Sequence, residues 1–589
     1  MKHALHRSMS GRGLALALLA AAFAACGRAD KASAPTLPVF GTVAPLTAAD
    51  VNLILRRAFL SIDTPDLHVA VVDRTGEILG VSSSAATITD GANVAISLAR
   101  TTAYFSNSQA PLSSRTVETL GTFHFPPTFS EPFVPSARPV STGGVAADRD
   151  SVIAPTRTTT GIVGTPQGPL WQINATNRGA AIATALTAPP TAFNAGNEFR
   201  PSRNLQGNTV FPAAPGGTFP SPGITLLPGA VPLFKPNVEG TGLRLVGGIG
   251  CFVRRNPGGA TVEADIDAAE FAAISGARGT GATGDENFFF DAIPLEGAIT
   301  IVGILLPYVQ QTTRPAGRNA RVGPPPAPLT GPRAGRVDPF GFLVGPRAAQ
   351  NGARRLSAAL PGVAALTQAD VQRIIDQVVA SANLTRAQVR LPLGSGAKVI
   401  ATVVDTRGLI LAHFRMEDTL CDAVDVVPAK ARSVVYYCLP STLPQSAFAN
   451  NDTWPGFPTA DPRGVALTTR TLGFLSQPFY PPGIDENPPG PLFALAQFNQ
   501  QPAQVERWGR AAADPGYQNG LTFFPGSVPL YKGGELVGAL GVSGDGVEQN
   551  DLIAFDGGAG FEPPTELRID NFTFEGVRLP YLKFPQTPR

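Results

Sequence analysis

The chain has 589 residues, too many for a single ordinary hydrophobic core, so two or more domains are expected. Hydrophobic residues make up 43% of the chain and charged residues 15%, while 63 glycines and 57 prolines predict long irregular loops around compact cores. The formal net charge is only +2 and no basic tract is concentrated, which argues against a nucleic-acid-binding protein.

The N-terminal 26 residues predict a signal peptide of the lipoprotein type. Basic residues stand near the start, and the apolar run at 14–25 is too short to span a bilayer. The run ends in Phe23-Ala-Ala-Cys26, which resembles a bacterial lipobox with Phe in place of the usual Leu. We therefore expect a lipid on Cys26, a tether at 27–45, and a membrane-anchored exported protein at the outer membrane or cell surface, or facing the periplasm. The alternative is ordinary signal-peptide cleavage near Ala25, which would release a soluble protein.

An internal repeat organises the rest of the chain. Leu46-Thr-Ala-Ala-Asp-Val51 recurs as Leu366-Thr-Gln-Ala-Asp-Val371, and in each the Thr three residues before the Asp predicts a capped helix start. Apolar residues follow at helical spacing in both copies. Each repeat is therefore expected to open with an amphipathic helix.

Two further elements follow in each copy. Val71-Val-Asp-Arg-Thr-Gly-Glu-Ile-Leu79 matches Val403-Val-Asp-Thr-Arg-Gly-Leu-Ile-Leu411, and β-rich runs separated by Asp and Gly predict a hairpin. A second helix is expected at 95–105 and at 425–437. The latter would place Cys421 and Cys438 at opposite ends of a helix, roughly 20 Å apart and too distant for a disulfide.

The closest match lies further along, where residues 223–235 and 520–532 share 8 of 13 positions and predict a strand containing Gly-x-Val-Pro. Both copies end in Leu-Pro-Tyr, at 306–308 and 579–581. We divide the chain into a first domain at 46–309, a Pro/Gly-rich linker at 310–361 and a second domain at 362–589, with insertions at about 121–222 and 441–519. The insertions hold all three tryptophans, so they are either functional or braces between the domains.

The ordered set of motifs resembles the GlcG/HbpS-like haem-binding family, which includes the C-terminal domain of PduO-type proteins. The second copy carries the fuller pattern, in Leu411-Ala-His-Phe-Arg-Met416, Lys430-Ala-Arg432 and Val537-Gly-Ala-Leu-Gly-Val-Ser-Gly544. The first copy departs from it, with Leu98 in place of Lys430 and Gly250-Cys-Phe-Val253 in place of Gly-Val-Ser-Gly. The resemblance implies an α+β fold, in which two profilin-like domains each contain a mainly antiparallel sheet flanked by helices. The joined copies would form an intramolecular pseudo-dimer, which could assemble further.

The resemblance also implies a haem or tetrapyrrole ligand, which needs an apolar slot, an iron ligand and cations for the propionates. On the hairpin strand, His413 is the candidate iron ligand, with Arg415 and Met416 beside it. On the second helix, Lys430 and Arg432 could bind a carboxylate, although they could equally be charges on a solvated helix face. Tyr436 is a further donor that would fit core packing equally well.

Weaker candidates lie in the first copy. His68 starts the region equivalent to the hairpin strand and is a lesser candidate ligand. Glu263, Asp265 and Asp267 alternate as in a solvated strand or loop, with calcium as a weak alternative.

The main hypothesis is an exported tetrapyrrole-binding protein that acts in capture, buffering or sensing. The alternative is a structural or interaction lipoprotein whose insertions dock an unknown protein partner. An enzyme acting on a small organic acid ranks last, because the sequence offers no catalytic triad, cofactor loop or metal set. Enzymatic activity is thus left undecided, and a binding role is favoured.

Overall fold

In the computed structural model, the residues whose structure can be described are 41–84, 90–122, 124–126, 162, 164–171, 173, 224–253, 263–279, 286–290, 299–329, 331–336, 338, 340–344, 366–439, 463–477, 479–485, 487–493 and 522–588. The segments predicted as signal peptide and lipobox and most of the predicted tether lie outside these residues, as do Trp454 and Trp508. Both repeats belong to one compact unit, Thr42–Arg589. No helix in the described ranges is long and apolar enough to cross a membrane.

Each repeat opens with a helix that is capped as the sequence predicts. These helices are α2 (Ala48–Ser61) and α8 (Gln368–Leu384). The Thr47 hydroxyl accepts the Asp50 amide at 3.1 Å, and the Asp50 carboxylate accepts the Thr47 amide at 2.7 Å. Thr367 and Asp370 make the same reciprocal pair. Both caps therefore satisfy amide groups that a helix start leaves without intrahelical partners.

The two sheets share one strand order. In the first repeat it is β2-β1-β4-β3, and in the second β9-β8-β11-β10 with β7 added beside β9. All of these neighbours are antiparallel. The strands are β1 (Leu67–Asp73), β2 (Ile78–Ser83), β3 (Ala230–Pro236), β4 (Leu243–Val253), β7 (Gly341–Val344), β8 (Val399–Asp405), β9 (Ile410–Arg415), β10 (Ser527–Lys532) and β11 (Glu535–Gly544). The predicted α+β class with mainly antiparallel sheets is confirmed.

The predicted hairpins connect β1 to β2 and β8 to β9, and their turns have a chemical basis in the repeated Asp and Gly. The Asp405 carboxylate accepts the amides of Arg407 and Leu409, both at 2.9 Å, and so closes the turn. Gly408 has a φ of +70°, which favours glycine. Asp73 accepts the Thr75 and Glu77 amides in the same way in the first repeat.

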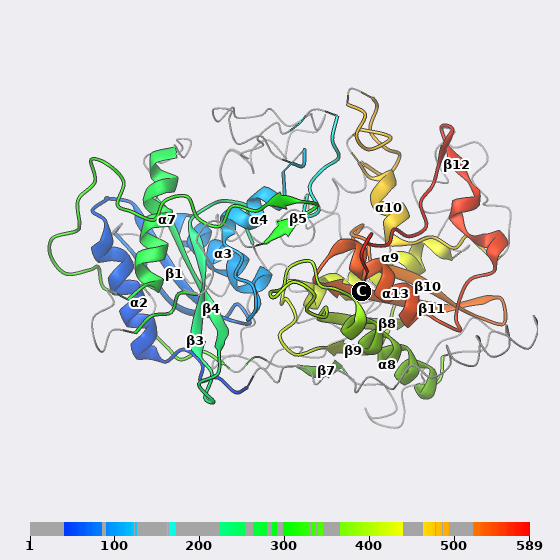
Figure 1. Ribbon diagram of the computed structural model, residues 1–589, viewed down its shortest axis with the longest axis horizontal. Coiled ribbons are helices and arrows are strands. Elements are labelled where there is room, and N and C mark those ends of the chain that lie inside the picture. Colours follow the sequence, from blue (N-terminus) through cyan, green and yellow to red (C-terminus); the bar gives the residue numbers. More distant parts are fainter. Residues whose placement is uncertain are drawn as a thin grey trace, which may run out of the picture. The chain divides into compact units, whose positions relative to one another are not determined.

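Helices cover both faces of each sheet (Figure 1). Helices α2 and α7 (Glu263–Ala277) pack on one face of the first sheet, and α3 (Asp90–Phe105) packs on the other. In the second repeat the counterparts are α8 with α13 (Val547–Gly557), and α9 (Ala423–Cys438) on the opposite face. A glycine on the central strand allows the single helix to lie close: a Cβ on Gly541 would come within 2.5 Å of the Val427 carbonyl. Gly250 would similarly meet the Ala95 carbonyl at 2.2 Å.

The predicted solvated strand or loop at residues 263–267 is wrong, because these residues begin helix α7. Asp265 is buried and pairs with Arg318 at 3.2 Å, so at least one of its carboxylate oxygens is used within the fold. Within the described ranges, no cluster of His, Cys, Asp and Glu side chains is arranged to hold a metal ion. The weak calcium alternative therefore has no support from geometry.

Two short helices at the insertions correspond between the repeats. Helix α4 (Ser114–Leu120) leads into the first insertion and α10 (Thr469–Leu475) lies in the second, and these two are the insertion helices. The hydroxyl of Thr116 donates to the Pro307 carbonyl at 2.8 Å, and that of Thr471 donates to Pro580 at 2.7 Å. Each Leu-Pro-Tyr motif thus fastens an insertion helix to its own repeat. Short hairpins precede the two motifs, namely β5 (Thr300–Ile301) with β6 (Ile304–Leu305), and β12 (Thr573–Phe574) with β13 (Val577–Arg578).

The segment predicted as a linker runs along the outer strands of both sheets. The amide of Leu329 donates to the carbonyl of Val81 on β2, at 2.7 Å. Further along, β7 pairs with β9, the corresponding strand of the second sheet. Outer strands carry unpaired backbone groups that invite association with other chains, and this one segment covers part of each.

Candidate functional site

The insertions and the second repeat enclose a cavity of about 390 Å³. The first repeat supplies the segment around Phe125 and Trp171 and the β5–β6 turn. The second supplies α10, the residues just before β10, the start of α13 and Lys583. The lining residues are Phe125, Pro166, Gln167, Gly168, Pro169, Trp171, Ile301, Val302, Gln388, Arg470, Gly473, Phe474, Ser476, Gln477, Pro482, Phe523, Phe524, Pro525, Val547, Glu548 and Lys583. Neither repeat alone would form this cavity.

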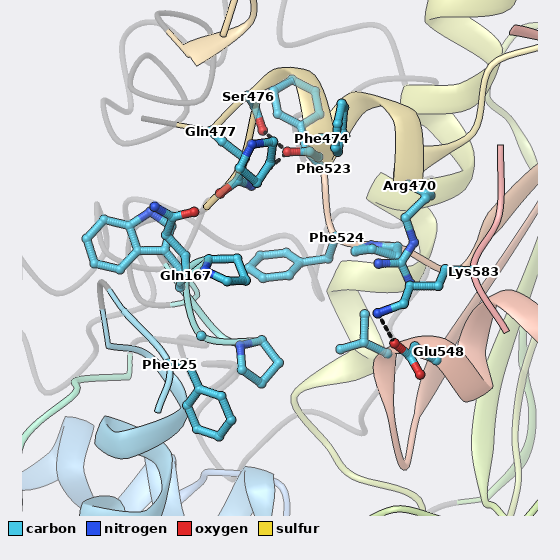
Figure 2. Close-up of a pocket in the computed structure, with 18 of the residues that line it drawn as sticks. Phe125, Gln167, Arg470, Phe474, Ser476, Gln477, Phe523, Phe524, Glu548 and Lys583 are labelled. Carbon is cyan, nitrogen blue, oxygen red and sulfur yellow. Dashed lines mark hydrogen bonds and ion pairs between the residues drawn. The ribbon is translucent and has the colours of Figure 1, made fainter. Parts of the chain in front are cut away.

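The cavity is lined by both aromatic and charged side chains (Figure 2). Phe125 lies on one side, Arg470, Glu548 and Lys583 lie on the other, and Phe524 projects between them. Lys583 pairs with Glu548 at 2.5 Å, although the lysine side chain stays 66% exposed. Such a lysine is free to reorient toward an anionic ligand, since exposed ion pairs contribute little energy.

Arg470, one of these charged side chains, is held firmly in place. Its Nε donates to the Asp551 carboxylate at 2.7 Å, and the same carboxylate oxygen accepts the Lys583 amide at 3.1 Å. The Nη2 atom of Arg470 is buried and has no hydrogen-bond partner among the residues that the structure describes. A buried unpaired guanidinium nitrogen beside a cavity is the group that a carboxylate would satisfy.

A smaller chamber of about 70 Å³ adjoins the main cavity and shares Pro169, Gln388 and Phe524 with its lining. Lys430 of α9 lines this chamber and is only 1% exposed. Its ammonium donates to the carbonyls of Pro525 at 2.7 Å and Val542 at 3.0 Å, and to the Ser543 hydroxyl at 3.0 Å. Burial lowers the pKa of Lys430 to about 7.

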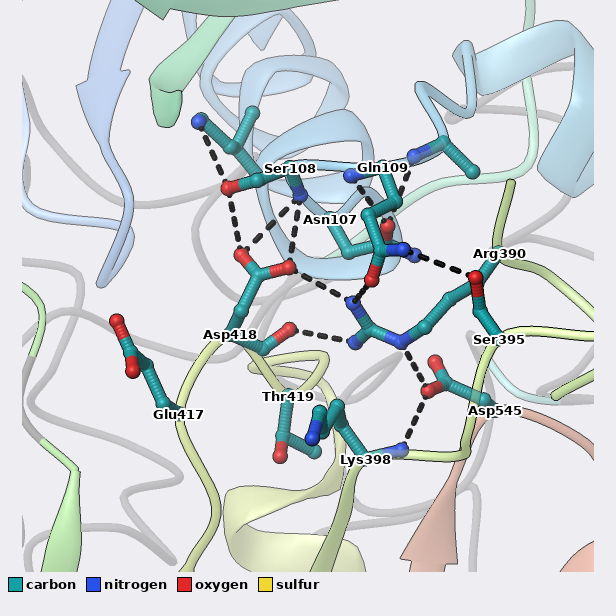
Figure 3. A network of polar contacts seen from close by, with 12 residues as sticks. Asn107, Ser108, Gln109, Arg390, Ser395, Lys398, Glu417, Asp418, Thr419 and Asp545 are labelled. Carbon is teal, nitrogen blue, oxygen red and sulfur yellow. Dashed lines mark hydrogen bonds and ion pairs between the residues drawn. The ribbon is translucent and has the colours of Figure 1, made fainter. Parts of the chain in front are cut away.

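A buried polar network joins the two repeats beside these cavities (Figure 3). Arg390 donates to Asp418 at 2.8 Å and pairs with Asp545, and all three side chains are almost fully buried. Asp418 in turn accepts the amide and the hydroxyl of Ser108 from the first repeat, and the Gln109 carbonyl oxygen accepts Arg390 at 3.1 Å. Burial opposes ionisation of Asp418, but Arg390 and Arg74 outweigh it and lower its pKa.

His413, the candidate iron ligand, lies on β9 as predicted and is fully buried. Its Nδ1 lies 2.7 Å from the Thr402 hydroxyl, while its Nε2 has no hydrogen-bond partner among the described residues. Burial first, and Arg432 and Arg415 second, lower the pKa of His413 to about 3, so the ring is neutral. It lines neither cavity, and its role as an iron ligand stays a prediction.

The other predicted ligand residues do not gather around one ligand. Arg415 pairs with Asp338 and donates to the Thr419 carbonyl, and Arg432 donates to the Gly408 carbonyl at 2.8 Å. Met416 packs in the core on the α8 side of the sheet, and Tyr436 packs in the core around α9. Of the six residues predicted to bind the ligand, Lys430 alone lines either of the two cavities described above.

The alternative that Lys430 and Arg432 lie on a solvated helix face is wrong. Both are buried, because α9 has the sheet on one side and α10 on the other. Cys438 is also buried at the end of α9, and Cys251, Cys421 and Cys438 are free thiols.

Comparison with known proteins assigns the second repeat. Residues 366–558 match the family model described as "Haem degrading protein HbpS-like". The second repeat is therefore similar to the HbpS-like family over most of its length. The crystal structure of a PduOC:heme complex is similar over 34% of this chain and 99% of that chain, with 22% identity and a TM-score of 0.20. The crystal structure of Klebsiella pneumoniae protein ORFY, of the DUF336 family, is similar over 35% and 93%, with 19% identity and a TM-score of 0.20. No curated protein matched the chain.

The cavity residues outside the HbpS-like match were missed by the sequence analysis. Phe125 and Trp171 come from the insertion of the first repeat, and Lys583 lies beyond residue 558. One signal was visible: Gly168-Pro-Leu-Trp171 shares its pattern with Gly490-Pro-Leu-Phe493, which indicates that both insertions are ordered. In the structure the amides of Leu170 and Leu492 donate to Leu120 and Leu475, the last residues of the insertion helices.

Proposed function

We propose that the chain binds haem or a related tetrapyrrole in the cavity between its repeats, for capture, buffering or sensing. The observation that carries the proposal is a cavity lined by several aromatic side chains together with two cations, Arg470 and Lys583. Its volume of about 390 Å³ falls within the range of small-molecule sites, about 300–1,000 Å³. The description of the matched family, which names haem, supports the choice of ligand.

The residues fit the organic part of such a ligand. Phe125, Trp171 and Phe524 offer aromatic surface to a flat ring, and aromatic contacts contribute beyond their buried area. Arg470 and Lys583 stand where they could pair with propionate groups.

The same residues do not fit the iron. Haem proteins bind iron axially through His, Cys, Met or Tyr, and none of these residue types lines the two described cavities. We therefore infer that the ligand is held by its ring and its carboxylates, and we assign no step to the iron.

The test is a titration of the full chain with haemin and, separately, with metal-free protoporphyrin IX, followed by Soret absorbance. Both ligands are expected to bind with affinities within about tenfold of each other. Trp171→Ala should weaken both by about tenfold or more, because an aromatic contact is worth roughly 1–3 kcal/mol. His413→Ala should leave both titrations unchanged. Absence of binding by either ligand would refute the proposal, and loss of haemin binding alone in His413→Ala would restore the histidine as an iron ligand.

We further propose that the protein is exported and anchored through a lipid on Cys26. The basis is the lipobox-like Phe23-Ala-Ala-Cys26 after a short apolar run. Cells expressing the full chain are expected to incorporate labelled palmitate into it, and Cys26→Ser is expected to abolish the label. Label retained in the variant would contradict this anchor.

The alternative function, docking of a protein partner by the insertions, has one observation in its favour. In the first repeat, Leu98 and Phe252 fill the place of Lys430 and Ser543, so this repeat has an apolar core where the second has a chamber. If neither tetrapyrrole binds, this alternative becomes the leading one.

A further inference from the structure

The small chamber beside α9 contains a lysine that the fold itself does not require. Lys430 is almost completely buried, and burying an ammonium is costly unless it is well compensated. At the equivalent place in the first repeat, Leu98 is fully buried in an apolar cluster. Two copies of one scaffold thus pack there with and without the amine, so a chemical role for Lys430 accounts for its presence better than packing does.

The three hydrogen-bond acceptors around Lys430 suit a neutral amine as well as an ammonium. An ammonium donates to all three, whereas an amine has two N–H donors and one lone pair. The carbonyls of Pro525 and Val542 can accept the two N–H groups, and the Ser543 hydroxyl can reverse its role and donate to the lone pair. Deprotonation therefore leaves no buried hydrogen bond unmade.

The charges around the chamber leave Lys430 close to its point of deprotonation at neutral pH. Burial lowers its pKa to about 7, Asp422 of the chamber wall and Asp551 of α13 favour the ammonium, and Arg470 of α10 opposes it. In the part of the chain that the structure describes, the hydrogen bonds of Nζ go to the two carbonyls and the hydroxyl rather than to these charged groups. At neutral pH, a large share of the protein molecules then carry Lys430 as the neutral amine, which is the nucleophilic form.

We propose that Lys430 forms a reversible Schiff base with a small carbonyl compound, an aldehyde or a 2-oxo acid, that enters the chamber from the main cavity. The amine nitrogen attacks the carbonyl carbon, and the C–N bond forms as the carbonyl oxygen takes a proton. Loss of that oxygen as water, with the two protons of the amine, then gives the C=N bond. Ser543 is placed to carry the proton between nitrogen and oxygen.

The chamber also limits and orients the substrate. Its volume of about 70 Å³ is roughly that of a few water molecules, which suits a compound of a few non-hydrogen atoms. Asn550 lines the same chamber, and its buried side-chain oxygen has no hydrogen-bond partner within the described ranges. It could accept the hydroxyl of the tetrahedral adduct. This site does not depend on tetrapyrrole binding, although the two would share an entrance.

The test is reductive trapping on the folded full-length chain at pH 7, with acetaldehyde in one arm, glyoxylate in the other, and cyanoborohydride to reduce the C=N bond. Peptide mass spectrometry should find the secondary amine at Lys430 before it appears at Lys532, an internal control that is paired with Asp370. Lys430→Leu should remove this adduct while keeping the melting temperature, since Leu98 occupies the same place in the first repeat. Ser543→Ala should slow trapping at least fivefold.

Trapping on the wild-type protein alone tests the proposal, even if a variant unfolds. Modification of Lys532 with Lys430 untouched would overturn the proposal, as would an adduct at Lys430 that forms only after denaturation. Trapping in one arm alone would support the proposal and identify the carbonyl class. Haemin binding in the absence of trapping would refute this site and leave the tetrapyrrole proposal standing.

Discussion

In the first repeat, Leu98 of α3 and Phe252 of β4 close the space between helix and sheet, whereas Lys430 of α9 and Ser543 of β11 stand there in the second. The backbone arrangement is similar in the two repeats. A long helix packs closely on the sheet because a glycine, Gly250 or Gly541, lies on the strand beneath it. The two repeats thus differ at this place by an apolar pair in the first and a polar pair beside a chamber in the second. The difference shows that this fold tolerates either solution at one place.

A second difference lies on the same face of the two sheets, where each repeat holds a buried histidine against a hydroxyl. In the first repeat, His68 of β1 lies 2.9 Å from Ser83 of β2. In the second, the strands exchange roles, and His413 of β9 meets Thr402 of β8 at 2.7 Å. At the register of His413 and Thr402 the first repeat has Val81 and Ala70, an apolar pair.

The largest expected effect comes from breaking the buried polar network of Arg390, Asp418 and Asp545 that joins the two repeats. Arg390→Met should lower the free energy of unfolding by about 3–5 kcal/mol, because it leaves Asp418 and Asp545 buried without their shared cation. Urea denaturation of the full chain, followed by circular dichroism, measures it. The matched control is Arg463→Met, which removes a more exposed pair with Glu566 and should cost less than about 1 kcal/mol. Equal losses of unfolding free energy in the two variants would show that this polar network does not hold the repeats together.

The next largest effect is expected when Leu98 or Lys430 is replaced by the residue that stands at the same place in the other repeat. Leu98→Lys should destabilise the protein by about 3 kcal/mol, since it buries an amine where Phe252 replaces the Ser543 hydroxyl. Lys430→Leu should cost less than about 1 kcal/mol or stabilise, because an apolar side chain replaces a costly buried charge. Thermal unfolding of both variants checks the contrast. If Lys430→Leu proved the more damaging, the lysine would be a structural requirement of the second repeat.

Local patterns in the sequence predicted the first helix, the hairpin and the second helix of both repeats, because each pattern acts within a few residues. The Thr-x-x-Asp caps and the Asp and Gly of the hairpins form the structures expected of them. Each of these devices satisfies backbone groups with partners that are close in the chain or fixed by the repeat.

The site could not be predicted in the same way, because it depends on residues brought together from distant segments. Trp171 and Lys583 line one cavity although more than 400 positions separate them. The burial of Lys430 also escaped prediction, since its ammonium is enclosed by Pro525, Val542 and Ser543, which lie about a hundred positions further along the chain. Helical spacing alone does not reveal what covers the second side of a helix.

A smaller effect concerns the histidine of the second repeat and its dependence on pH. The pKa of His413 is lowered to about 3 by burial and by Arg432 and Arg415, whereas an unfolded histidine titrates near 6.5. Between these values the unfolded chain binds a proton that the folded chain does not. The contribution of the neutral His413 to the free energy of unfolding is therefore fully present above about pH 6.5. It is lost as the pH falls toward 3, by at most about 1.4 kcal/mol per pH unit.

The double variant His413→Val with Thr402→Ala reproduces the Val81 and Ala70 pair of the first repeat. Its free energy of unfolding, measured in urea at pH 4.5, 5.5 and 6.5, should fall less steeply with decreasing pH than that of the wild type. Parallel slopes would mean that His413 titrates normally, and the inferred neutral ring would have to be abandoned.

The smallest expected effect concerns the helix caps at Thr47 and Thr367, a feature in which the two repeats should behave alike. Thr47→Ala and Thr367→Ala each remove a capping hydroxyl at the start of α2 or α8, and each should cost about 1 kcal/mol. The surroundings also correspond, because Asp50 pairs with Lys235 and Asp370 with Lys532, both at 2.9 Å. Thermal unfolding of the two single variants should therefore give shifts that agree within about 0.5 kcal/mol. A cost confined to one variant would mean that the repeats differ in how their first helix supports the sheet, and the contrast at Leu98 and Lys430 could then no longer be assigned to those residues alone.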